Sequence, residues 1–266
     1  MKYGLCANMI STTEEHTGYE WIPIIKELGF DYIELPLAQM MDLEADRFNS
    51  LIVSRLKEND LPCICCNNFF PASMRLTGPD ANHKSAVEYA ARAFVRAARI
   101  GAQIVVFGSS GARNIPVGFS KRDAEAQLES LLAELSVLAG EYNLSLALES
   151  LNSFESNILN HLSECRAMVH RVNLPNVRLL ADTYHMCMVS DSFDELAKCP
   201  GEILHVHIAR PLGRSLPCEG DEVDWEKLFR TLKGINYNGG ISIEATVPGM
   251  HRIKSIEECL AFIRRC

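Results

Sequence analysis

The chain has 266 residues, of which 47% are hydrophobic and 23% charged, a balance typical of a globular protein with one large α/β core. Its formal net charge is -8 and lysines and arginines do not cluster, which argues against nucleic acid or an acidic membrane surface as the main partner. The N-terminus lacks a charged-then-apolar leader, and no apolar run approaches the ~20 residues of a membrane span. We therefore expect a cytoplasmic protein that acts on a small molecule.

Short apolar runs alternate with longer segments in which apolar residues recur at three- and four-residue spacing. The predicted strands are Tyr3–Asn8, Asp31–Leu35, Pro62–Cys66, Gln103–Phe107, Ser145–Glu149, Val177–Asp182, Ile203–Ile208 and Gly240–Glu244. The predicted helices are Tyr19–Leu28, Ala45–Glu58, His83–Ile100, Lys121–Tyr142, Leu162–Val172, Phe193–Cys199, Asp224–Lys233 and Ser255–Arg265. Ser120, Asp224 and Ser255 are the predicted N-caps.

Eight strand–helix units in roughly 250 residues match the size of one (β/α)8 barrel. The competing doubly wound sheet would want a glycine-rich turn after its first strand, and Ala7-Asn8-Met9-Ile10-Ser11 has no glycine. No interdomain linker is evident. We predict an α/β protein, a single (β/α)8 TIM barrel that spans residues 1–266 as one domain.

Ten cysteines are distributed along the chain. In the strand-like run Cys63-Ile-Cys65-Cys66, strict alternation places Cys63 and Cys65 on one side and Cys66 on the other, which is poor geometry for a shared metal. The other cysteines are scattered without a C-x-x-C pair. We expect reduced thiols packed as small hydrophobic side chains.

The longest loop with a composition of its own, Gly108–Phe119, follows the fourth predicted strand. Its glycines together with Arg113 are compatible with an anion cradle, and equally with a loop that covers a substrate.

Four predicted strands carry a potential metal ligand at or next to their carboxyl ends: Glu149, Asp182, His207 and Glu244. A single glutamate at a strand end is usually a surface ion pair. Strand ends converge at the mouth of a parallel barrel, however, and alternate residues point inward, so we expect these four side chains to meet. Three carboxylates without a cation would repel one another and force at least one pKa upward, whereas a divalent metal removes the repulsion.

This donor set is mostly hard oxygen, which suits Mn²⁺, Mg²⁺ or Co²⁺ better than a thiolate-preferring Zn²⁺ site, and Mn²⁺ is the first expectation. In His205-Val-His207 we expect His207 on the metal and His205, one layer deeper, in the core.

Five blocks in chain order resemble the xylose isomerase-like barrels and, within them, the D-tagatose 3-epimerase and D-psicose (allulose) 3-epimerase group. The blocks are Glu149-Ser-Leu-Asn-Ser-Phe-Glu155, Asp182-Thr-Tyr-His185-Met, His205-Val-His207, Arg214-Ser-Leu-Pro217 and Ile243-Glu244. The first hundred residues match only in the general barrel pattern, as in Leu28–Glu34. The run between His207 and Arg214 is one residue longer than is common in that group, and Gly108–Arg113 stands where the group tends to place bulky aromatics. Both departures touch the pocket and leave the substrate open.

The resemblance implies roles for seven side chains: a metal held by Glu149, Asp182, His207 and Glu244, an acid/base pair of Glu149 and Glu244, and substrate contacts from Glu155, His185 and Arg214. The implied activity is a divalent-metal-dependent sugar epimerase or isomerase that acts through a cis-enediolate, first of all a ketose 3-epimerase. The alternatives are an aldose–ketose isomerase, an epimerase of a keto-glycoside or sugar phosphate, and a non-catalytic sugar-binding barrel. The expected partners are a sugar substrate and further copies of the chain, in a dimer or tetramer.

A metal-dependent apurinic endonuclease of the same fold would use additional histidines to bind a cluster of zinc ions. The third and fourth strands end in Asn67-Asn68-Phe69 and Gly108-Ser109-Ser110, without histidine. The acidic charge balance also disfavours DNA, so we set this function aside.

Overall fold

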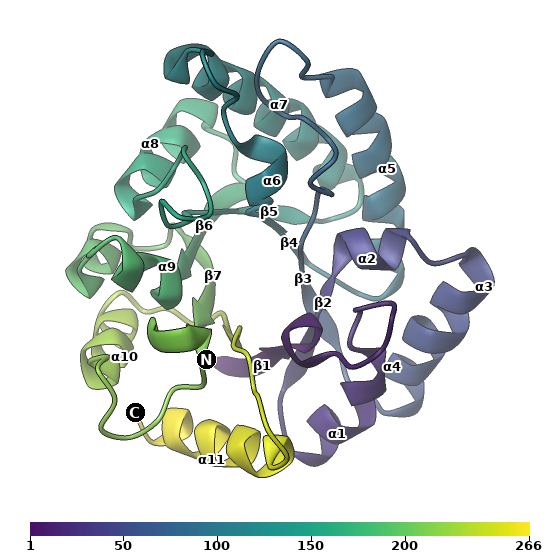
Figure 1. Ribbon diagram of the computed structural model, residues 1–266, viewed down its shortest axis with the longest axis vertical. Coiled ribbons are helices and arrows are strands. Elements are labelled where there is room, and N and C mark those ends of the chain that lie inside the picture. The colour runs from purple at the N-terminus through teal and green to yellow at the C-terminus, as the bar shows by residue number, and fades with distance from the viewer.

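In a computed structural model that describes residues 1–266, the eight apolar runs form eight strands. They are β1 (Lys2–Cys6), β2 (Tyr32–Pro36), β3 (Cys63–Asn67), β4 (Ile104–Phe107), β5 (Ser145–Glu149), β6 (Val177–Asp182), β7 (Ile203–Ile208) and β8 (Gly240–Ile243). Each strand pairs in parallel with the next, and β8 pairs with β1 to close the barrel (Figure 1). The predicted (β/α)8 TIM barrel is confirmed.

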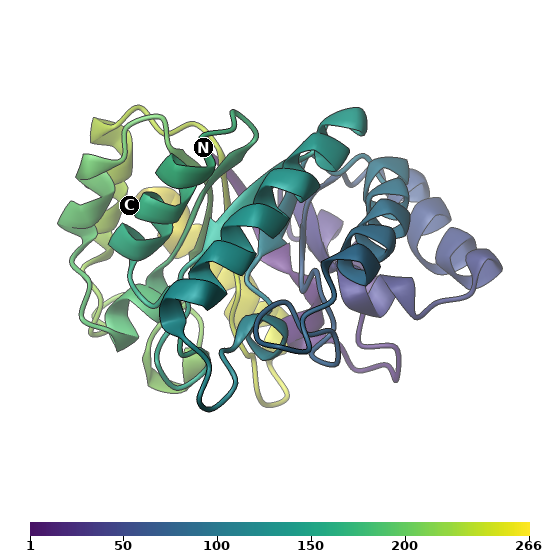
Figure 2. The same cartoon turned by 90° about the horizontal axis from the view of Figure 1, so that it is seen from above.

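The segments between the strands form helices that surround the barrel (Figure 1). They are α1 (Ile22–Glu27), α2 (Leu37–Met41), α3 (Ala45–Phe48), α4 (Ser54–Glu58), α5 (His83–Arg99), α6 (Ser110–Arg113), α7 (Lys121–Glu141), α8 (Leu162–Val172), α9 (Thr183–Met188), α10 (Trp225–Gly234) and α11 (Arg252–Arg265). Short 3-10 helices cover Ala7–Ile10, Tyr19–Trp21, Phe193–Lys198 and Leu212–Arg214. In the side view of Figure 2 the long helix α7, in teal, crosses in front of the strands. None of the helices combines the length and apolar character that crossing a membrane requires.

The predicted helices differ from the structure in detail. The segment 45–58 is helical throughout, as predicted, but a π-helical turn over Asn49–Val53 separates α3 from α4. Ser120 and Asp224 accept hydrogen bonds from backbone N–H groups in the first turns of α7 and α10, as predicted for N-caps. Ser255 does not cap a helix, because α11 begins three residues earlier, at Arg252.

Side chains fill the inside of the barrel. An apolar cluster of Cys65, Ile104, Val106, Ala147 and Leu180 occupies part of the interior. Tyr32 fills another part and requires glycine on both sides: a Cβ at Gly4 would lie 2.1 Å from its ring, and one at Gly240 would lie 2.7 Å from its hydroxyl.

The cysteine-rich strand β3 contains a register shift. Ile33 pairs with Cys63 but the next residue, Glu34, pairs with Cys65, so Ile64 is an extra residue in the ladder. Cys65 therefore packs inside the barrel while Cys63 joins the outer core, and the prediction that these two side chains share a face is wrong. All ten cysteines are free thiols and seven are buried, in agreement with their predicted role as small hydrophobic residues.

Candidate active site

The four predicted metal ligands meet at the carboxyl ends of the strands. Glu149 and Asp182 are the last residues of β5 and β6, His207 is next to last in β7, and Glu244 directly follows β8. One ligand-type atom of each lies within 4.8 Å of those of the other three, and the four residues are 0–7% exposed. The parallel register brings this about, since it places Asp182 beside His207 on the neighbouring strand.

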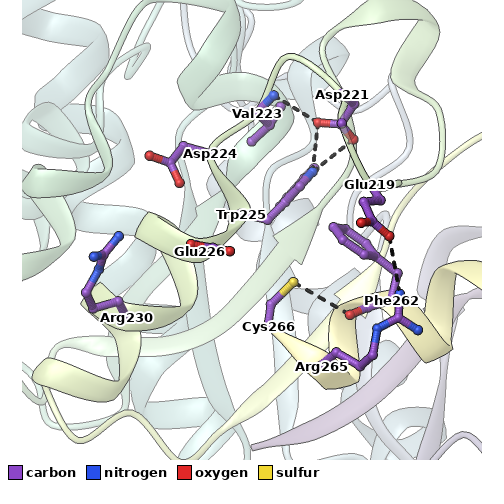
Figure 3. A pocket seen from close by; sticks show the side chains of 11 residues that line it. Glu219, Asp221, Val223, Asp224, Trp225, Glu226, Arg230, Phe262, Arg265 and Cys266 are labelled. Carbon is purple, nitrogen blue, oxygen red and sulfur yellow. Dashed lines mark hydrogen bonds and ion pairs between the residues drawn. The ribbon is translucent and has the colours of Figure 1, made fainter.

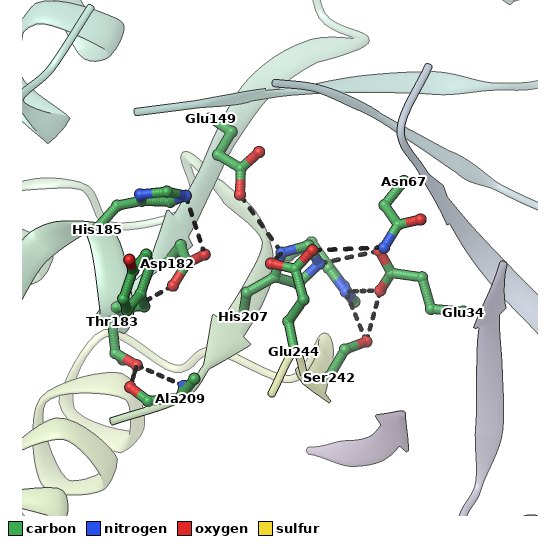
Figure 4. Close-up of polar contacts among 12 residues, drawn as sticks. Glu34, Asn67, Glu149, Asp182, Thr183, His185, His207, Ala209, Ser242 and Glu244 are labelled. Atoms are coloured by element: carbon green, nitrogen blue, oxygen red, sulfur yellow. Dashed lines mark hydrogen bonds and ion pairs between the residues drawn. The ribbon is translucent and has the colours of Figure 1, made fainter. Parts of the chain in front are cut away.

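The imidazole of His207 connects two layers of the site (Figure 4). Its Nε2 donates a hydrogen bond to Glu34 Oε1 at 2.9 Å. Its Nδ1 lies 3.4 Å from Glu149 Oε1 and 3.1 Å from Glu244 Oε2 and makes no hydrogen bond. A buried ring nitrogen without a hydrogen bond, directed at carboxylate oxygens, is the atom that a cation would engage.

Crowding of the carboxylates separates their pKa values. Burial, reinforced by the charges of Glu244 and Glu149 and opposed by Arg214, raises the pKa of Asp182 to about 8. Burial also acts on Glu244, but Arg214 and His207 outweigh it and lower its pKa to about 2. The pKa of His207 lies well above its usual value, because the surrounding carboxylates overcome the effect of burial. Without a metal, the cluster relieves its repulsion by retaining protons.

The donors at the mouth fit a divalent cation, since three carboxylates and one imidazole are ligands that hard and borderline ions accept. Two other groups of ligand type lie deeper: Cys6 with Glu34 and His207, and Glu34 with Cys65 and His205. Burial raises the pKa of both thiols well above the usual range, which keeps them neutral and makes them poor ligands. The predicted set is therefore the best suited to hold a metal.

Gly108, directly after β4, makes room for the Glu149 carboxylate. A Cβ at this position would lie 2.1 Å from Glu149 Oε2. Nearby, the fully buried guanidinium of Arg113 donates to the carbonyl oxygens of Phe107 at 3.3 Å and Glu149 at 2.8 Å. The arginine of this loop thus fixes the main chain around a site carboxylate and is not available to an anion.

Arg214 enters the site from the loop after β7. Its Nη2 donates to Glu244 Oε2 and lies 3.4 Å from Asp182 Oδ2, and its Nη1 lies 3.7 Å from Glu155 Oε1. Its backbone has a φ of 45°, in the left-handed region, where Thr246 holds it by donating from its N–H to the Arg214 carbonyl at 2.8 Å. Such a conformation costs on the order of 1 kcal/mol in a residue other than glycine and is common at functional sites.

His185 lies one helical turn beyond Asp182 and is buried. Its Nδ1 accepts the backbone N–H of Asn152 at 3.1 Å, which leaves the ring proton on Nε2, 3.6 Å from Asp182 Oδ2. Burial lowers the pKa of His185 to about 3, so the ring is neutral and presents a hydrogen-bond donor to the site.

A cavity of about 260 Å³ lies above the cluster. The predicted residues that line it are Glu149, Glu155, His185, Arg214 and Glu244. The loops after β3 and β4 also contribute Phe70, Pro71, Ala72, Ser109, Ser110 and Gly111. The loop that begins at Gly108 therefore lines the cavity, consistent with the alternative of a substrate-covering loop. The size suits a small molecule.

A larger hollow of about 610 Å³ lies beside α10 and α11 (Figure 3). It contains none of the metal-ligand set, and its acidic side chains have local structural uses. Asp221, for example, accepts from the Trp225 indole at 2.8 Å and from the Val223 backbone at 2.9 Å. The smaller cavity is the one with convergent reactive groups.

Sequence reasoning missed several supporting residues. Glu34 lies beneath His207, Asn67 Nδ2 lies 3.5 Å from Glu244 Oε1, and Asn152 contacts both His185 and Glu155. Two of them left a signal in the sequence: Glu34 is an acid near the end of a predicted strand, and Asn152 lies in the block from Glu149 to Glu155.

Residues 22–266 match the sequence profile of the xylose isomerase-like TIM barrel family. The D-psicose 3-epimerase of Agrobacterium fabrum is 28% identical over 236 residues, which cover 85% of this chain and 78% of that protein. The 3-dehydro-D-guloside 4-epimerase of Escherichia coli is 24% identical over 256 residues, which cover 91% of this chain and 92% of that protein.

Solved structures show the same fold. The D-psicose 3-epimerase of Clostridium cellulolyticum H10, solved with D-tagatose, superposes with a TM-score of 0.86 at 20% identity, over 100% of this chain and 99% of that one. The 3-keto-D-glucoside 4-epimerase of Escherichia coli, in its apo form, gives a TM-score of 0.82 at 20% identity, with 100% of both chains covered.

Proposed function

The chain belongs to the xylose isomerase-like TIM barrel family, and from that premise we propose that it is a divalent-metal-dependent sugar epimerase that inverts C3 of a ketose. Relatives named as epimerases support an isomerase of the carbohydrate-epimerase class. The observation that carries the proposal is the pair Glu149 and Glu244. Both carboxylates are nearly buried and line one small cavity. Glu149 ends β5 and Glu244 directly follows β8, and β6 and β7 lie between these two strands.

Inverting a carbon beside a ketone requires that a proton leave one face and another arrive at the opposite face. We assign these transfers to Glu149 and Glu244. One carboxylate takes the proton from the carbon, and the other, in its acid form, returns a proton from the other side. In the reverse reaction the two side chains exchange roles.

We propose that Glu149, Asp182, His207 and Glu244 hold the metal, with Mn²⁺ first and Mg²⁺ or Co²⁺ as alternatives. When bound, a divalent metal supplies Lewis-acid stabilisation to the oxygens of a cis-enediolate. The oxygen-rich donor set and the free Nδ1 of His207 support this assignment.

Glu155, His185 and Arg214 are assigned to substrate binding, since all three line the cavity. Arg214 brings a cation beside Glu244, where its donors can bind a substrate oxygen on which negative charge develops. Neutral His185 offers an Nε2 donor, and Glu155 offers an acceptor for a sugar hydroxyl.

A second candidate is 4-epimerisation of a keto-glycoside. The relative of Escherichia coli that is named for this activity aligns over 91% of this chain. The chemistry needs the same pair of carboxylates, so only the substrate distinguishes the two reactions.

The test combines a substrate panel with matched variants. Protein stripped of metal by a chelator should be inactive, and Mn²⁺ or Co²⁺ should restore inversion at C3 of a ketose. Glu149→Gln and Glu244→Gln should each lose nearly all turnover, whereas Glu257→Gln, at an exposed position on α11, should match the wild type. Full turnover in strictly metal-free protein would contradict the proposal, and activity on a keto-glycoside alone would favour the second candidate.

Three further assignments remain predictions: a single domain over residues 1–266, a cytoplasmic location, and a homo-oligomer, either dimer or tetramer. Exposed apolar side chains on the loops after β4, β5, β7 and β8 support assembly, since such surface is often covered by a partner. They are Val117, Phe154, Leu212 and Met250. Light scattering coupled to gel filtration measures the oligomeric state.

A further inference from the structure

Glu34 is a fully buried carboxylate inside the barrel that makes no ion pair with a lysine or arginine. Burying such a group is costly unless hydrogen bonds satisfy it. Glu34 Oε1 accepts from His207 Nε2 at 2.9 Å, and Oε2 accepts from His205 Nε2 at 2.9 Å and from Ser242 Oγ at 2.6 Å. Oε1 thus contacts a member of the ligand set. Oε2 contacts His205 and Ser242, which together with Tyr32 form the layer that we call the barrel floor.

The floor holds the carboxylate in place. The Ser242 hydroxyl has one proton, and Glu34 can only accept, so this proton goes to Glu34. The Tyr32 hydroxyl, 2.9 Å from Ser242 Oγ, must then be the donor to Ser242. Tyr32 is in turn confined by the close approach of Gly4 and Gly240. Rotation of the Glu34 carboxylate would break three hydrogen bonds at once.

We infer that Glu34 is a positioning residue that fixes both the tautomer and the orientation of His207, so that Nδ1 faces the cluster at the mouth. The inference rests on the metal site of the proposed function. When a metal displaces one proton from the ring, a carboxylate that only accepts keeps the other proton on Nε2, and Nδ1, which faces Glu149 and Glu244 (Figure 4), is left free to bind the metal. Loss of such a carboxylate typically weakens metal binding 10- to 100-fold.

The test measures Mn²⁺ affinity, without substrate, by electron paramagnetic resonance. Glu34→Gln keeps the size of the side chain but puts an amide where a carboxylate accepts three hydrogen bonds. We expect its affinity to fall about 10- to 100-fold. Ser242→Ala is the matched comparison, because it removes one hydrogen bond to the same carboxylate and leaves the bonds from His207 and His205 intact; its affinity should fall much less than that of Glu34→Gln.

A purely structural role for Glu34 predicts a different pattern. It would lower the melting temperature equally with chelator and with Mn²⁺, whereas the positioning role lowers the rise in melting temperature that Mn²⁺ produces. Unchanged Mn²⁺ affinity in Glu34→Gln would overturn the inference and leave the proposed function standing. Failure of the wild type to bind a divalent metal would overturn both.

A measurement on the wild type covers the case in which Glu34→Gln does not fold. In ¹⁵N spectra of the Mg²⁺-loaded protein, His207 should carry its proton on Nε2, with a hydrogen-bonded N–H signal at low field, and none on Nδ1. A ring protonated on Nδ1 would overturn the inference.

Discussion

Gly108→Ala should displace the carboxylate of Glu149, and the structure gives the size of the displacement. The Cβ of alanine would lie 2.1 Å from Glu149 Oε2 and 3.3 Å from its carboxyl carbon. Ordinary contact begins near 3.4 Å, so the carboxylate oxygen must move by about 1.3 Å. The backbone of Gly108 does not have a positive φ, so the effect comes from collision and not from backbone strain.

The size of the effect follows from the roles proposed for Glu149. A misplacement of about 1 Å in a reacting group can cost ~10²-fold in rate, equivalent to about 2.7 kcal/mol of transition-state stabilisation. Since Glu149 is also a proposed metal ligand, Mn²⁺ affinity should fall in the same variant. Arg113 cannot compensate, because it holds the main-chain carbonyl of Glu149 and not the carboxylate.

Steady-state kinetics and a Mn²⁺ titration on the same preparations provide the assay. Gly140→Ala is the control: this glycine lies within α7, and the nearest atom to an added Cβ is 3.9 Å away. It should leave activity unchanged and stabilise the protein by about 0.5–1 kcal/mol, since alanine is the better helix former. Wild-type kcat/KM and metal affinity in Gly108→Ala would refute the reasoning.

Three other predictions follow from the site and the cysteines. Metal uptake near pH 7 should release about two protons, because Asp182, with a pKa of about 8, and His207, with a raised pKa, are both protonated in the metal-free protein. Affinity should therefore rise as pH increases through the Asp182 pKa of about 8, and calorimetry in buffers of different ionisation enthalpy counts the protons; pH-independent binding would contradict this. Arg214→Ala and Glu155→Gln should retain the metal by mass spectrometry and lose ~10²-fold in kcat/KM, whereas loss of metal would show that our division between metal ligands and substrate contacts is wrong. A thiol titration of denatured, unreduced protein should find all ten cysteines free, and missing pairs would indicate disulfides.

The strands and their ends were the most predictable features. The bounds of β5, β6 and β7 agree with the sequence residue for residue, because each is a buried run that ends at or next to a ligand-type side chain. The inward direction of Glu149, Asp182, His207 and Glu244 follows from alternation alone. Local pattern was sufficient there because the one irregularity in these strands, the extra residue Leu204 in β7, comes before His205 and leaves the alternation from His205 to the mouth intact.

Features set by distant partners could not be predicted. Glu34 lies in a predicted strand, but its role depends on His205 and His207, which follow it by 171 and 173 positions in the sequence. Arg113 looked like a loop cation, yet its acceptors are main-chain carbonyls, which leave no trace in the sequence. The shift that turns Cys63 away from Cys65 and the π-helical turn at Asn49–Val53 likewise depend on backbone packing and not on side-chain period.

Incubation with a ketose in deuterated water tests the two-carboxylate epimerase most directly. Because one carboxylate removes a proton and the other returns one after exchange with solvent, the inverted product should carry deuterium at C3. Both inversion and deuterium should disappear after metal removal and in Glu149→Gln and Glu244→Gln. An inverted product that retains its original hydrogen at that carbon would contradict the account.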